Sequence, residues 1–265
     1  MRAIYDIQPL SGTTSFAENG LAALDQIEYR RVLGGNDLED VFRLRYDAYR
    51  RKELIEPNSS SRSADKYDLS SNGQIFGLYY EDRLASSLRI HFASPEDPVC
   101  PTNSHFPGVL DDYFKRGSRF VDSSRFCADT YLSGLLPFLP FMTIRLTAMA
   151  CIYFDADFTL SVIRPEHASF YKRYYGMKKW VSSQKVDWFA HEVDLYANGR
   201  VENGDSILGR LPFFSSLKSE RMNLFGMPPD GTQSVSVTPS ARAALLLKHK
   251  NVEFRKSTPV LAATI

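Results

Sequence analysis

One arginine lies in the middle of an apolar helical stripe early in the chain, where its type and position could do chemistry. Read as a helix from about Asp37, with Asn36 or Asp37 as its cap, residues 37–52 form a broad apolar face with Arg45 near its centre. A guanidinium that faces a core must be paired, because an isolated buried charge is very costly. The helix therefore predicts a buried partner, which is either a carboxylate in a structural ion pair or an anionic ligand. The apolar face consists of Leu38, Val41, Phe42, Leu44, Ala48 and Tyr49.

Three later segments supply candidate partners for this arginine. They are Asp65-Lys66-Tyr67-Asp68, Leu88-Arg89-Ile90 and Val121-Asp122-Ser123-Ser124-Arg125-Phe126. Together with Tyr49, four residues after Arg45, these motifs in this order resemble the acyl-homoserine-lactone synthases and their relatives, the N-acyl amino acid synthases. Both families belong to the N-acetyltransferase (GNAT) superfamily. The resemblance covers roughly residues 27–180.

The resemblance implies an N-acyltransferase that forms an amide from an acyl thioester. Such a reaction must deprotonate the attacking amine, meet the tetrahedral oxyanion with hydrogen-bond donors, and release a thiolate. We expect no metal and no organic cofactor, because the five histidines are scattered and no Cys/His cluster has ligand spacing. The residues expected to be catalytic are Asp122, Arg125 and Arg45, and those expected to bind substrate are Tyr49, Asp65, Asp68, Arg89, Ser123, Ser124 and Phe126.

Asp122 stands where the resembling lactone synthases carry a glutamate proposed as base. The shorter side chain favours a water-mediated base or an anchor for the acceptor's ammonium group; otherwise Asp122 pairs with Arg45 or Arg125. On a regular strand, side chains alternate, so Asp122 and Arg125 would point to opposite faces. We therefore predict a β-bulge near Ser123 and Ser124.

The lack of basic residues in the loop before the central helix indicates which acyl donor the protein uses. Members of the superfamily that use coenzyme A carry a basic, glycine-rich loop before the central helix, whereas residues 129–135 contain one glycine and no basic residue. A phosphopantetheine tethered to acyl carrier protein is then favoured over free acyl-coenzyme A. Carrier proteins are acidic, so a basic docking patch is expected. Its candidates are Lys115, Arg116 and Arg119, or Lys172, Arg173, Lys178 and Lys179.

A fatty acyl chain needs an apolar slot, and the helix expected over about residues 139–154 is apolar nearly all round. Tyr171 or Tyr174 lies where some acetyltransferases place a tyrosine that protonates the thiolate. Cys127 is interpreted as a core thiol. The expected acyl pocket consists of Phe138, Phe141, Met142, Leu146, Met149, Leu160, Phe170 and Tyr171; for each of these residues, plain core packing is the alternative.

Three functions are compatible with these features. The leading hypothesis is transfer of a long-chain fatty acyl group from acyl carrier protein to the α-amine of a small amino-acid acceptor. The second is an acyl-homoserine-lactone synthase that uses S-adenosylmethionine. Against it, the expected tryptophan is missing near Leu54 and Ile55, Tyr49 replaces a phenylalanine, and Asp122 replaces a glutamate. The third is a non-catalytic module that binds acyl chains or carrier protein.

The elements that must position these residues form an α/β pattern. Strands are expected at about 27–33, 74–80, 83–92, 119–128, 158–163, 177–181 and 186–193, and helices at 37–52, 109–115, 139–154, from Pro165 to Gly176, and at 239–249. This order predicts a GNAT-like three-layer fold with a central mixed, mostly antiparallel sheet flanked by helices. We expect an N-terminal arm over residues 1–25, the acyltransferase domain over 26–198 and a C-terminal extension over 199–265.

The composition limits the possible core size, partners and cellular location of the protein. The 265 residues are 43% hydrophobic, which allows one sizeable core. Thirty-two basic and 31 acidic residues give no bulk field that favours nucleic acid. Three cysteines without metal-type spacing indicate reduced thiols, and no signal peptide or membrane span is apparent. We expect a cytoplasmic, bacterial enzyme without a transmembrane segment, for which peripheral membrane contact is possible.

Overall fold

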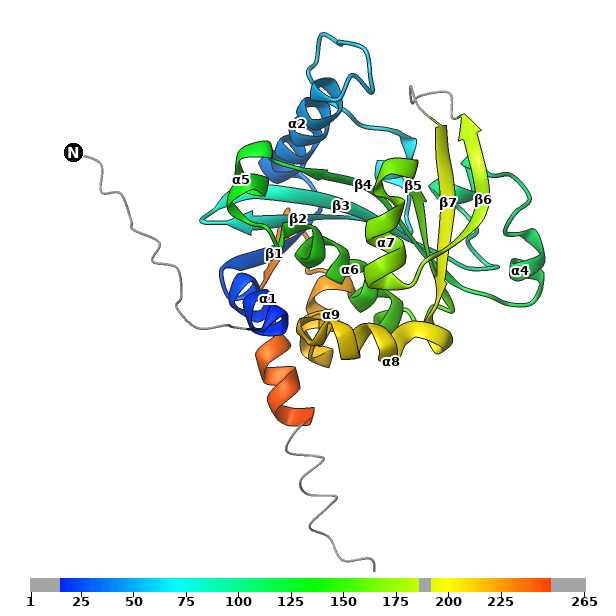
Figure 1. Ribbon diagram of the computed structural model, residues 1–265. Helices are drawn as coiled ribbons and strands as arrows, with labels where there is room; N and C mark the ends of the chain where they lie inside the picture. Colours follow the sequence, from blue (N-terminus) through cyan, green and yellow to red (C-terminus); the bar gives the residue numbers. More distant parts are fainter. Residues whose placement is uncertain (1–14, 186–191, 249–265) are drawn as a thin grey trace, which may run out of the picture.

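A twisted mixed sheet forms the centre of the computed structural model, which describes residues 15–185 and 192–248 (Figure 1). In that part of the chain the strand order is β6-β7-β5-β4-β3-β2-β1-β8. Neighbouring strands are antiparallel except for β4 and β5, which run parallel. The strands are β1 (Ile27–Val32), β2 (Gly73–Tyr80), β3 (Arg83–Ala93), β4 (Phe120–Ala128), β5 (Phe158–Ile163), β6 (Lys178–Lys185), β7 (Glu192–Gly199) and β8 (Ser234–Val237).

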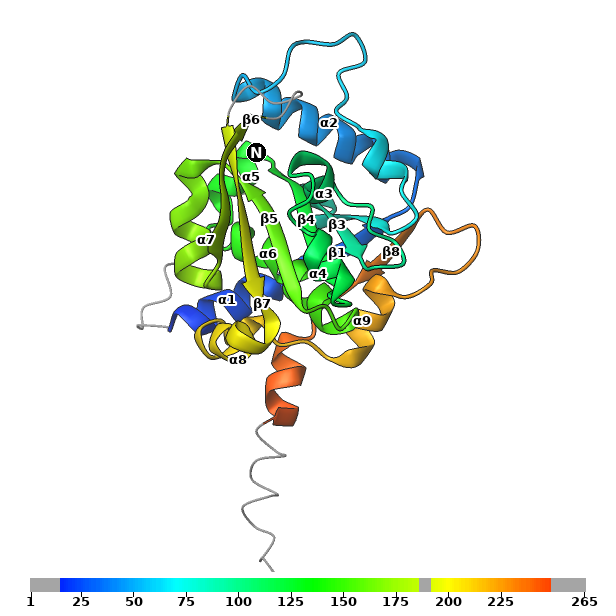
Figure 2. The same ribbon diagram turned by 90° about the vertical axis from the view of Figure 1, so that its right-hand side faces the viewer.

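Helices cover both faces of this sheet and complete a three-layer α/β fold. One face is packed by α1, α6, α7, α8 and α9, and the other by α2, α3 and α4 (Figure 2). The helices are α1 (Phe16–Leu24), α2 (Gly35–Arg51), α3 (Pro101–His105), α4 (Asp111–Lys115), α5 (Thr130–Leu135), α6 (Leu139–Tyr153), α7 (Ala168–Tyr175), α8 (Arg200–Arg210) and α9 (Lys218–Phe225), with the 3-10 helices η1 (Lys66–Leu69), η2 (Pro165–His167) and η3 (Pro212–Phe214).

Local sequence explains where the elements around the site begin and end. Pro140 lies in the first turn of α6, where its missing N–H has no partner to lose. Gly176 ends α7 in the left-handed conformation, with φ of 61°. Helix α2 presents Val41, Phe42, Arg45 and Tyr49 to the protein interior. The predicted apolar stripe with a central arginine is thereby confirmed, although α2 begins at Gly35 rather than at Asp37.

Strands β4 and β5 run side by side for only part of their length. Their parallel pairing ends at Ser123 and Ser161, while β4 continues to Ala128 and β5 to Ile163. On its other edge β4 contains a bulge, because Ser87 of β3 pairs with Cys127 and Arg89 pairs with Ser124. One residue of β3 is therefore opposed by two of β4, Arg125 and Phe126. The bulge lies just after the position predicted from the sequence, and Arg125 adopts a φ of 56°.

Described residues on both sides of the central segment pack into the core. The expected arm over residues 1–25 contains α1, whose Leu21 and Leu24 are buried. A Cβ on Gly20 would collide with the Phe213 ring, so the glycine permits the close approach of α1 to η3. The expected extension after residue 198 contributes β8 to the sheet edge and Phe213, Phe214, Leu224 and Phe225 to the main hydrophobic cluster. The arm and the extension therefore both contribute described residues to the core of the fold.

Two expected elements differ in position. The strand expected over residues 186–193 is β7, which begins at Glu192, and residues 186–191 lie outside the described part of the chain. The final helix expected over 239–249 is helical from residue 241 to residue 248. In the described residues, no helix combines the length and apolar character needed to cross a membrane.

Candidate active site

The buried arginine of α2 has a carboxylate partner. The Arg45 Nη1 donates a hydrogen bond of 2.8 Å to Asp68 Oδ1, and both side chains are buried. Asp68 lies in η1, whose start is fixed by reciprocal capping: Asp65 Oδ1 accepts from Tyr67 N, and Asp68 Oδ2 accepts from Asp65 N. The two aspartates therefore shape their own loop and at the same time face the arginine of α2.

Arg89 of β3 joins the two aspartates. Its Nη1 donates to Asp65 Oδ1 at 2.5 Å and to Asp68 Oδ1 at 2.9 Å. Its Nε donates to Ser124 Oγ at 3.1 Å, which ties the group to β4. Burial alone would raise the pKa of Asp68, but the guanidinium charges of Arg45 and Arg89 hold that pKa below its usual value.

The bulge in β4 turns Arg125 toward the same group. Arg125 Nη2 donates to Asp65 Oδ2 at 2.5 Å, and its guanidinium lies 5.5 Å from the centre of the Tyr49 ring. Although burial opposes the shift, Arg89 and Arg125 together hold the pKa of Asp65 well below its usual range. The result is an alternating chain of charges, Arg45–Asp68–Arg89–Asp65–Arg125, which we call the arginine–aspartate cluster.

Asp122 does not belong to this cluster. It is 1% exposed, and its Oδ2 accepts a 2.8 Å hydrogen bond from Thr102 N in the first turn of α3. Burial raises its pKa, and the hydrogen bonds from Thr102 only partly oppose that shift. Asp122 therefore pairs with neither Arg45 nor Arg125 among the described residues, and it holds the start of α3 on the sheet. Its expected role as a water-mediated base stays a prediction.

Two histidines that the sequence interpretation did not select lie near the cluster. The Nε2 of His91 lies 2.8 Å from Ser70 Oγ, and burial together with the charge of Arg89 lowers the pKa of His91 to about 4. His105 ends α3, and burial and the charge of Arg125 lower its pKa. Because His91 shares a strand face with Arg89, alternation along β3 was a signal that could have found it. No signal pointed to His105, since residues 94–107 are rich in proline.

The remaining motif residues divide between the two faces of the sheet. Ser124 accepts from Arg89 on the α2 face. Ser123 points to the α6 face, where its Oγ donates to Leu160 O at 3.0 Å and lies 2.7 Å from Ser161 Oγ. Phe126 packs against the main hydrophobic cluster. The motif around Asp122 thus presents polar side chains to both faces, at the point where β4 and β5 part.

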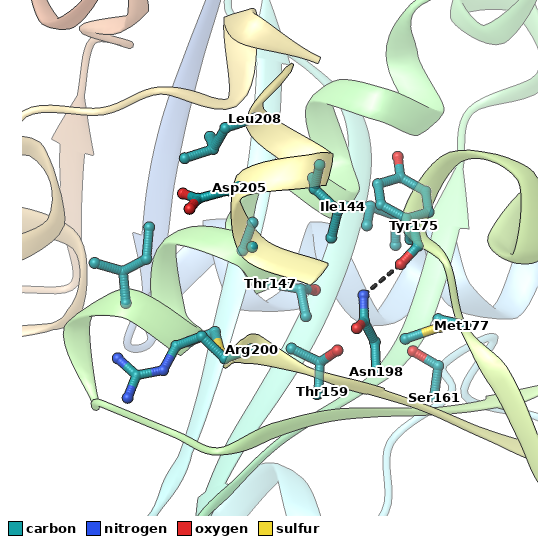
Figure 3. Close-up of a pocket in the computed structure, with 16 residues that line it drawn as sticks. Ile144, Thr147, Thr159, Ser161, Tyr175, Met177, Asn198, Arg200, Asp205 and Leu208 are labelled. Carbon is teal, nitrogen blue, oxygen red and sulfur yellow. Dashed lines mark hydrogen bonds between the residues drawn. The ribbon is translucent and has the colours of Figure 1, made fainter. Parts of the chain in front are cut away.

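A cavity of about 400 Å³ lies on the α6 face (Figure 3). Ser161 and Thr159 of β5 form part of its wall, and Ile144, Thr147 and Ala148 of α6 form another part. Asn198 and the first turns of α8 line it from the side of β7. Its size falls in the range of small-molecule sites.

Most of the residues expected to form an acyl pocket pack near this cavity without lining it. Phe138, Phe141, Met142, Leu146, Met149, Phe170 and Tyr171 belong to the main hydrophobic cluster. The prediction for Leu160 needs correction. Leu160 lies in a second hydrophobic cluster on the opposite face of the sheet, with Phe120 and Leu195. Thr159 and Ser161 alternate with Leu160 along β5, so the three cannot share a face. The aromatic rings fill the core around α6, and the hollow lies beside other positions of the same helix.

The expected basic docking patches are partly neutralised. Lys115 pairs with Asp112 at 2.9 Å, Arg119 with Asp155 at 2.6 Å, and Lys179 with Asp194 at 2.7 Å. Arg116 lies over the Tyr113 ring, Lys172 over the Tyr196 ring and Arg173 over the Tyr174 ring. At the expected donor loop, Asp129 caps α5 by accepting from Leu132 N at 2.8 Å. A carboxylate therefore stands where a coenzyme-A loop would present positive charge.

Cys127 is buried, and Tyr171 and Tyr174 are partly buried against the main hydrophobic cluster. Cys127 is 4% exposed, and burial raises its pKa, so the thiol stays protonated at neutral pH. Burial also raises the pKa of Tyr171 far above its usual value. The Tyr174 ring stacks on the Phe16 ring and meets the Phe141 ring edge to face. These contacts place all three residues in the packing of the core.

Comparison with known proteins defines the class and then the family. The fold is that of the N-acetyltransferase superfamily, and the chain is an N-acyltransferase. Residues 40–197 match the family described as "N-acyl amino acid synthase FeeM", and the chain belongs to this family. A search of curated proteins found no match.

Two solved structures show the shared fold. FeeM, an N-acyl amino acid synthase from uncultured soil microbes, is 15% identical, with a TM-score of 0.58 over 70% of this chain and 94% of its own. The acyl-homoserine-lactone synthase LasI is 16% identical, with a TM-score of 0.50 over 70% of this chain and 95% of its own. Helices α8 and α9 and strand β8 lie beyond the residues that the family match covers.

Proposed function

We propose that this acyltransferase moves a fatty acyl group from acyl carrier protein to the α-amine of an amino acid and so produces an N-acyl amino acid. One observation carries the proposal: a positively charged polar cluster on one face of the sheet is connected, through neighbouring serines where the pairing of β4 and β5 ends, to a largely apolar cavity on the other face. Ser161 lines the cavity and contacts Ser123, and the adjacent Ser124 binds Arg89 of the cluster.

The charge of the cluster supports an anionic acceptor. Three arginines face two aspartates, so the cluster carries one positive charge in excess. Asp65 has the most exposed side chain of the five, at 23%, and marks the side that a ligand can reach. The carboxylate of an amino acid would match the excess charge at Arg125, because charge-assisted hydrogen bonds to guanidinium are strong and directional.

The reaction would take place at the opening between the two strands. The amine nitrogen attacks the thioester carbonyl carbon, the carbon–sulfur bond breaks, and the proton lost by the amine ends on the phosphopantetheine sulfur. Backbone N–H groups of β4 beyond Ser123 are not paired with β5 and are suited to meet the oxyanion. The absence of basic residues in the loop at Asp129 favours acyl carrier protein over coenzyme A as donor.

His105 fits the role of proton acceptor better than Asp122 does. It stands within electrostatic range of Arg125 and Asp65, is half-buried, and has a lowered pKa, so it is neutral at pH 7. A neutral imidazole near pH 7 is suited to general base catalysis. Asp122, in contrast, is buried behind α3.

The test is to incubate the pure protein with long-chain acyl–acyl carrier protein and a pool of amino acids, and to search for amides by mass spectrometry. Amides that require the carrier-bound donor are expected, and their absence for all acyl lengths would contradict the proposal. Acyl-coenzyme A in a parallel reaction compares the donors. Adding S-adenosylmethionine and searching for a lactone and methylthioadenosine tests the lactone-synthase alternative.

His105→Gln should lower kcat by about 100-fold or more if the imidazole accepts the proton.

A further inference from the structure

The cavity on the α6 face contains two buried oxygen atoms that hydrogen bond to none of the described residues. They are Thr147 Oγ1 on α6 and Asn198 Oδ1 on β7; a third such oxygen, the Tyr175 hydroxyl, belongs to another lining residue. Thr147 is 4% exposed and Asn198 is 7% exposed, so neither is open to bulk solvent. Buried polar atoms in proteins are nearly always hydrogen bonded, so unpaired atoms on residues that line a cavity indicate a polar group of a bound molecule.

A neighbouring threonine shows how this helix normally satisfies a hydroxyl. One turn before Thr147, the Thr143 hydroxyl donates to Leu139 O at 2.8 Å and lies 2.7 Å from Ser86 Oγ. Thr147 has neither kind of partner among the described residues, and its side chain faces the cavity (Figure 3). The same residue type on the same helix is thus satisfied at Thr143, where the core is filled, and unsatisfied at Thr147, beside the hollow.

The orientation of the Asn198 amide is fixed by its surroundings. Its Nδ2 donates to the carbonyl oxygen of Tyr175, as the dashed line in Figure 3 shows. Reversing the amide would place two acceptor oxygens against each other. Asn198 Oδ1 therefore remains as an acceptor at the cavity wall, and it requires a donor from whatever binds there. The Tyr175 hydroxyl is likewise buried without a hydrogen bond to a described residue, but it points away from this amide (Figure 3).

We propose that the cavity selects a fatty acyl chain that bears a hydroxyl group, with Asn198 and Thr147 as the specificity-determining residues. The inference rests on the proposed function and names its acyl substrate class. A hydroxyl group has both the donor that Asn198 Oδ1 requires and an acceptor for the Thr147 hydroxyl. A keto oxygen satisfies only Thr147, and a plain methylene satisfies neither. The apolar remainder of the chain would pack on Ile144, Met177 and Leu208.

The part of the cavity wall that α8 forms lies outside the segment of the chain that matches the family. The match ends at residue 197, whereas Asn198 and the lining residues Arg200, Asp205, Ile207 and Leu208 follow it. Residues after the match thus complete the cavity, and they supply the acceptor oxygen. Chain selection can therefore differ between members of the family without change to the arginine–aspartate cluster.

The experiment compares chains of one length that differ only at one carbon: hydroxylated at a series of positions, oxidised to a ketone at the same positions, or unsubstituted. Each is presented as its acyl carrier protein thioester, and kcat/KM for amide formation is measured with the full-length protein. For at least one position the hydroxylated chain should be preferred over the unsubstituted chain by tenfold or more, because a site built for a hydroxyl rejects an analogue that lacks it. Equal or lower values at every position overturn the inference, as does a preference for the ketone.

Thr147→Val is the matched variant, because it removes the hydroxyl and keeps the shape. It should reduce the preference at least fivefold, mainly by improving use of the unsubstituted chain. Thr159→Val is the control, since Thr159 lines the same cavity but is half-buried and has no unpaired buried oxygen. An unchanged preference in Thr147→Val, or an equal loss in both variants, contradicts the assignment.

A binding measurement separates this inference from the proposed function. The Kd values of free hydroxylated and unsubstituted fatty acids are determined by calorimetry for the wild type and for Thr147→Val. A preference for the hydroxylated acid that Thr147→Val abolishes supports the cavity assignment even if no amide forms, and that combination contradicts only the proposed function. Amide formation without any preference contradicts only the assignment of the hydroxyl.

Discussion

Two buried sites in the protein contain arginine: Arg145 with Glu220, and the arginine–aspartate cluster. They differ in how completely the guanidinium N–H groups are hydrogen bonded. Arg145 of α6 donates through Nε to Phe213 O, through Nη1 to Glu220 Oε1, and through Nη2 to Glu220 Oε2 and Ser215 O. Glu220 accepts in turn from Ser240. In the arginine–aspartate cluster, Arg45 Nε and Nη2 are buried and make no hydrogen bond to a described residue.

The difference distinguishes a structural ion pair from a candidate ligand-binding site. One arginine and one glutamate are matched in charge at Arg145, and both are closed off from solvent. The cluster has three arginines for two aspartates, and it opens to solvent at Asp65. An unbalanced buried charge lowers the stability of the fold. A bound anion that enters at the exposed side can offset that loss. The two groups should therefore respond oppositely to mutation, in stability and in activity.

The largest effect is expected at Arg145. Arg145→Met should lower the free energy of unfolding by about 3–5 kcal/mol, because it leaves Glu220 buried and unpaired. The protein that remains folded should keep its kcat. Urea denaturation and assays well below the transition measure the two quantities. The double variant Arg145→Met/Glu220→Leu should recover much of the loss, and a single-variant loss below about 1 kcal/mol would refute the structural assignment.

Arg125→Met should show the opposite pattern. We expect kcat/KM for the amino acid to fall by about 10- to 150-fold, equivalent to about 1.5–3 kcal/mol for a charge-assisted hydrogen bond, mostly through KM. Asp65 keeps Arg89 as partner, so the change in stability should be smaller than at Arg145. Arg62→Met is the control, since Arg62 pairs with Glu39 at the surface. Equal kinetics in the two variants would remove Arg125 from the site.

The stability of the cluster should depend on pH through Asp65. Its pKa in the folded protein is held below the ordinary value of 3.8, so its stabilisation is complete above that pH and is lost as the pH falls toward the folded pKa. Asp65→Asn should be less stable than the wild type by about 1.5 kcal/mol at pH 7. The difference should shrink steadily below pH 4, as followed by thermal unfolding. A difference that stays constant down to pH 2 would contradict the charge network.

The smallest effect is expected at Asp122. Its folded pKa is raised, so the protonated form stabilises the fold fully below pH 3.8, and that contribution is lost as the pH rises through the folded pKa. Asn keeps an acceptor for Thr102 N without the buried charge, so Asp122→Asn should change stability at pH 7 by no more than about 0.5 kcal/mol. We expect kcat to fall less than tenfold. A loss above 100-fold at unchanged stability would restore the role of base.

The charged helix and its partners were predictable from the sequence, because their signals are local. Helical spacing placed Arg45 on the buried face of α2, and the rule that buried charges need partners predicted a carboxylate or an anionic ligand; Asp68 provides the carboxylate. Alternation along β4 also showed that Arg125 needs a bulge to share a face with Asp122. The bulge lies at Arg125 and Phe126, and the positive φ of Arg125 has no residue signature of the kind that glycine gives.

The position of Asp122 could not be predicted, because it depends on a helix that the sequence conceals. Residues 94–107 contain several prolines, which disfavour regular elements, yet Pro101 opens α3, and Asp122 accepts from its first turn. The cavity was missed for another reason. Helix α6 is apolar on all sides, so periodicity cannot tell its filled face from the face beside the hollow.

Product analysis with labelled substrate tests the central claim most directly. The purified protein is given acyl–acyl carrier protein and amino acids labelled with nitrogen-15, and amides are identified by mass spectrometry. The account predicts a nitrogen-15-labelled N-acyl amino acid from the wild type, a yield reduced at least tenfold in Arg125→Met, and a yield per folded molecule close to wild type in Arg145→Met. No labelled amide from the wild type, or equal losses in both variants, would contradict it.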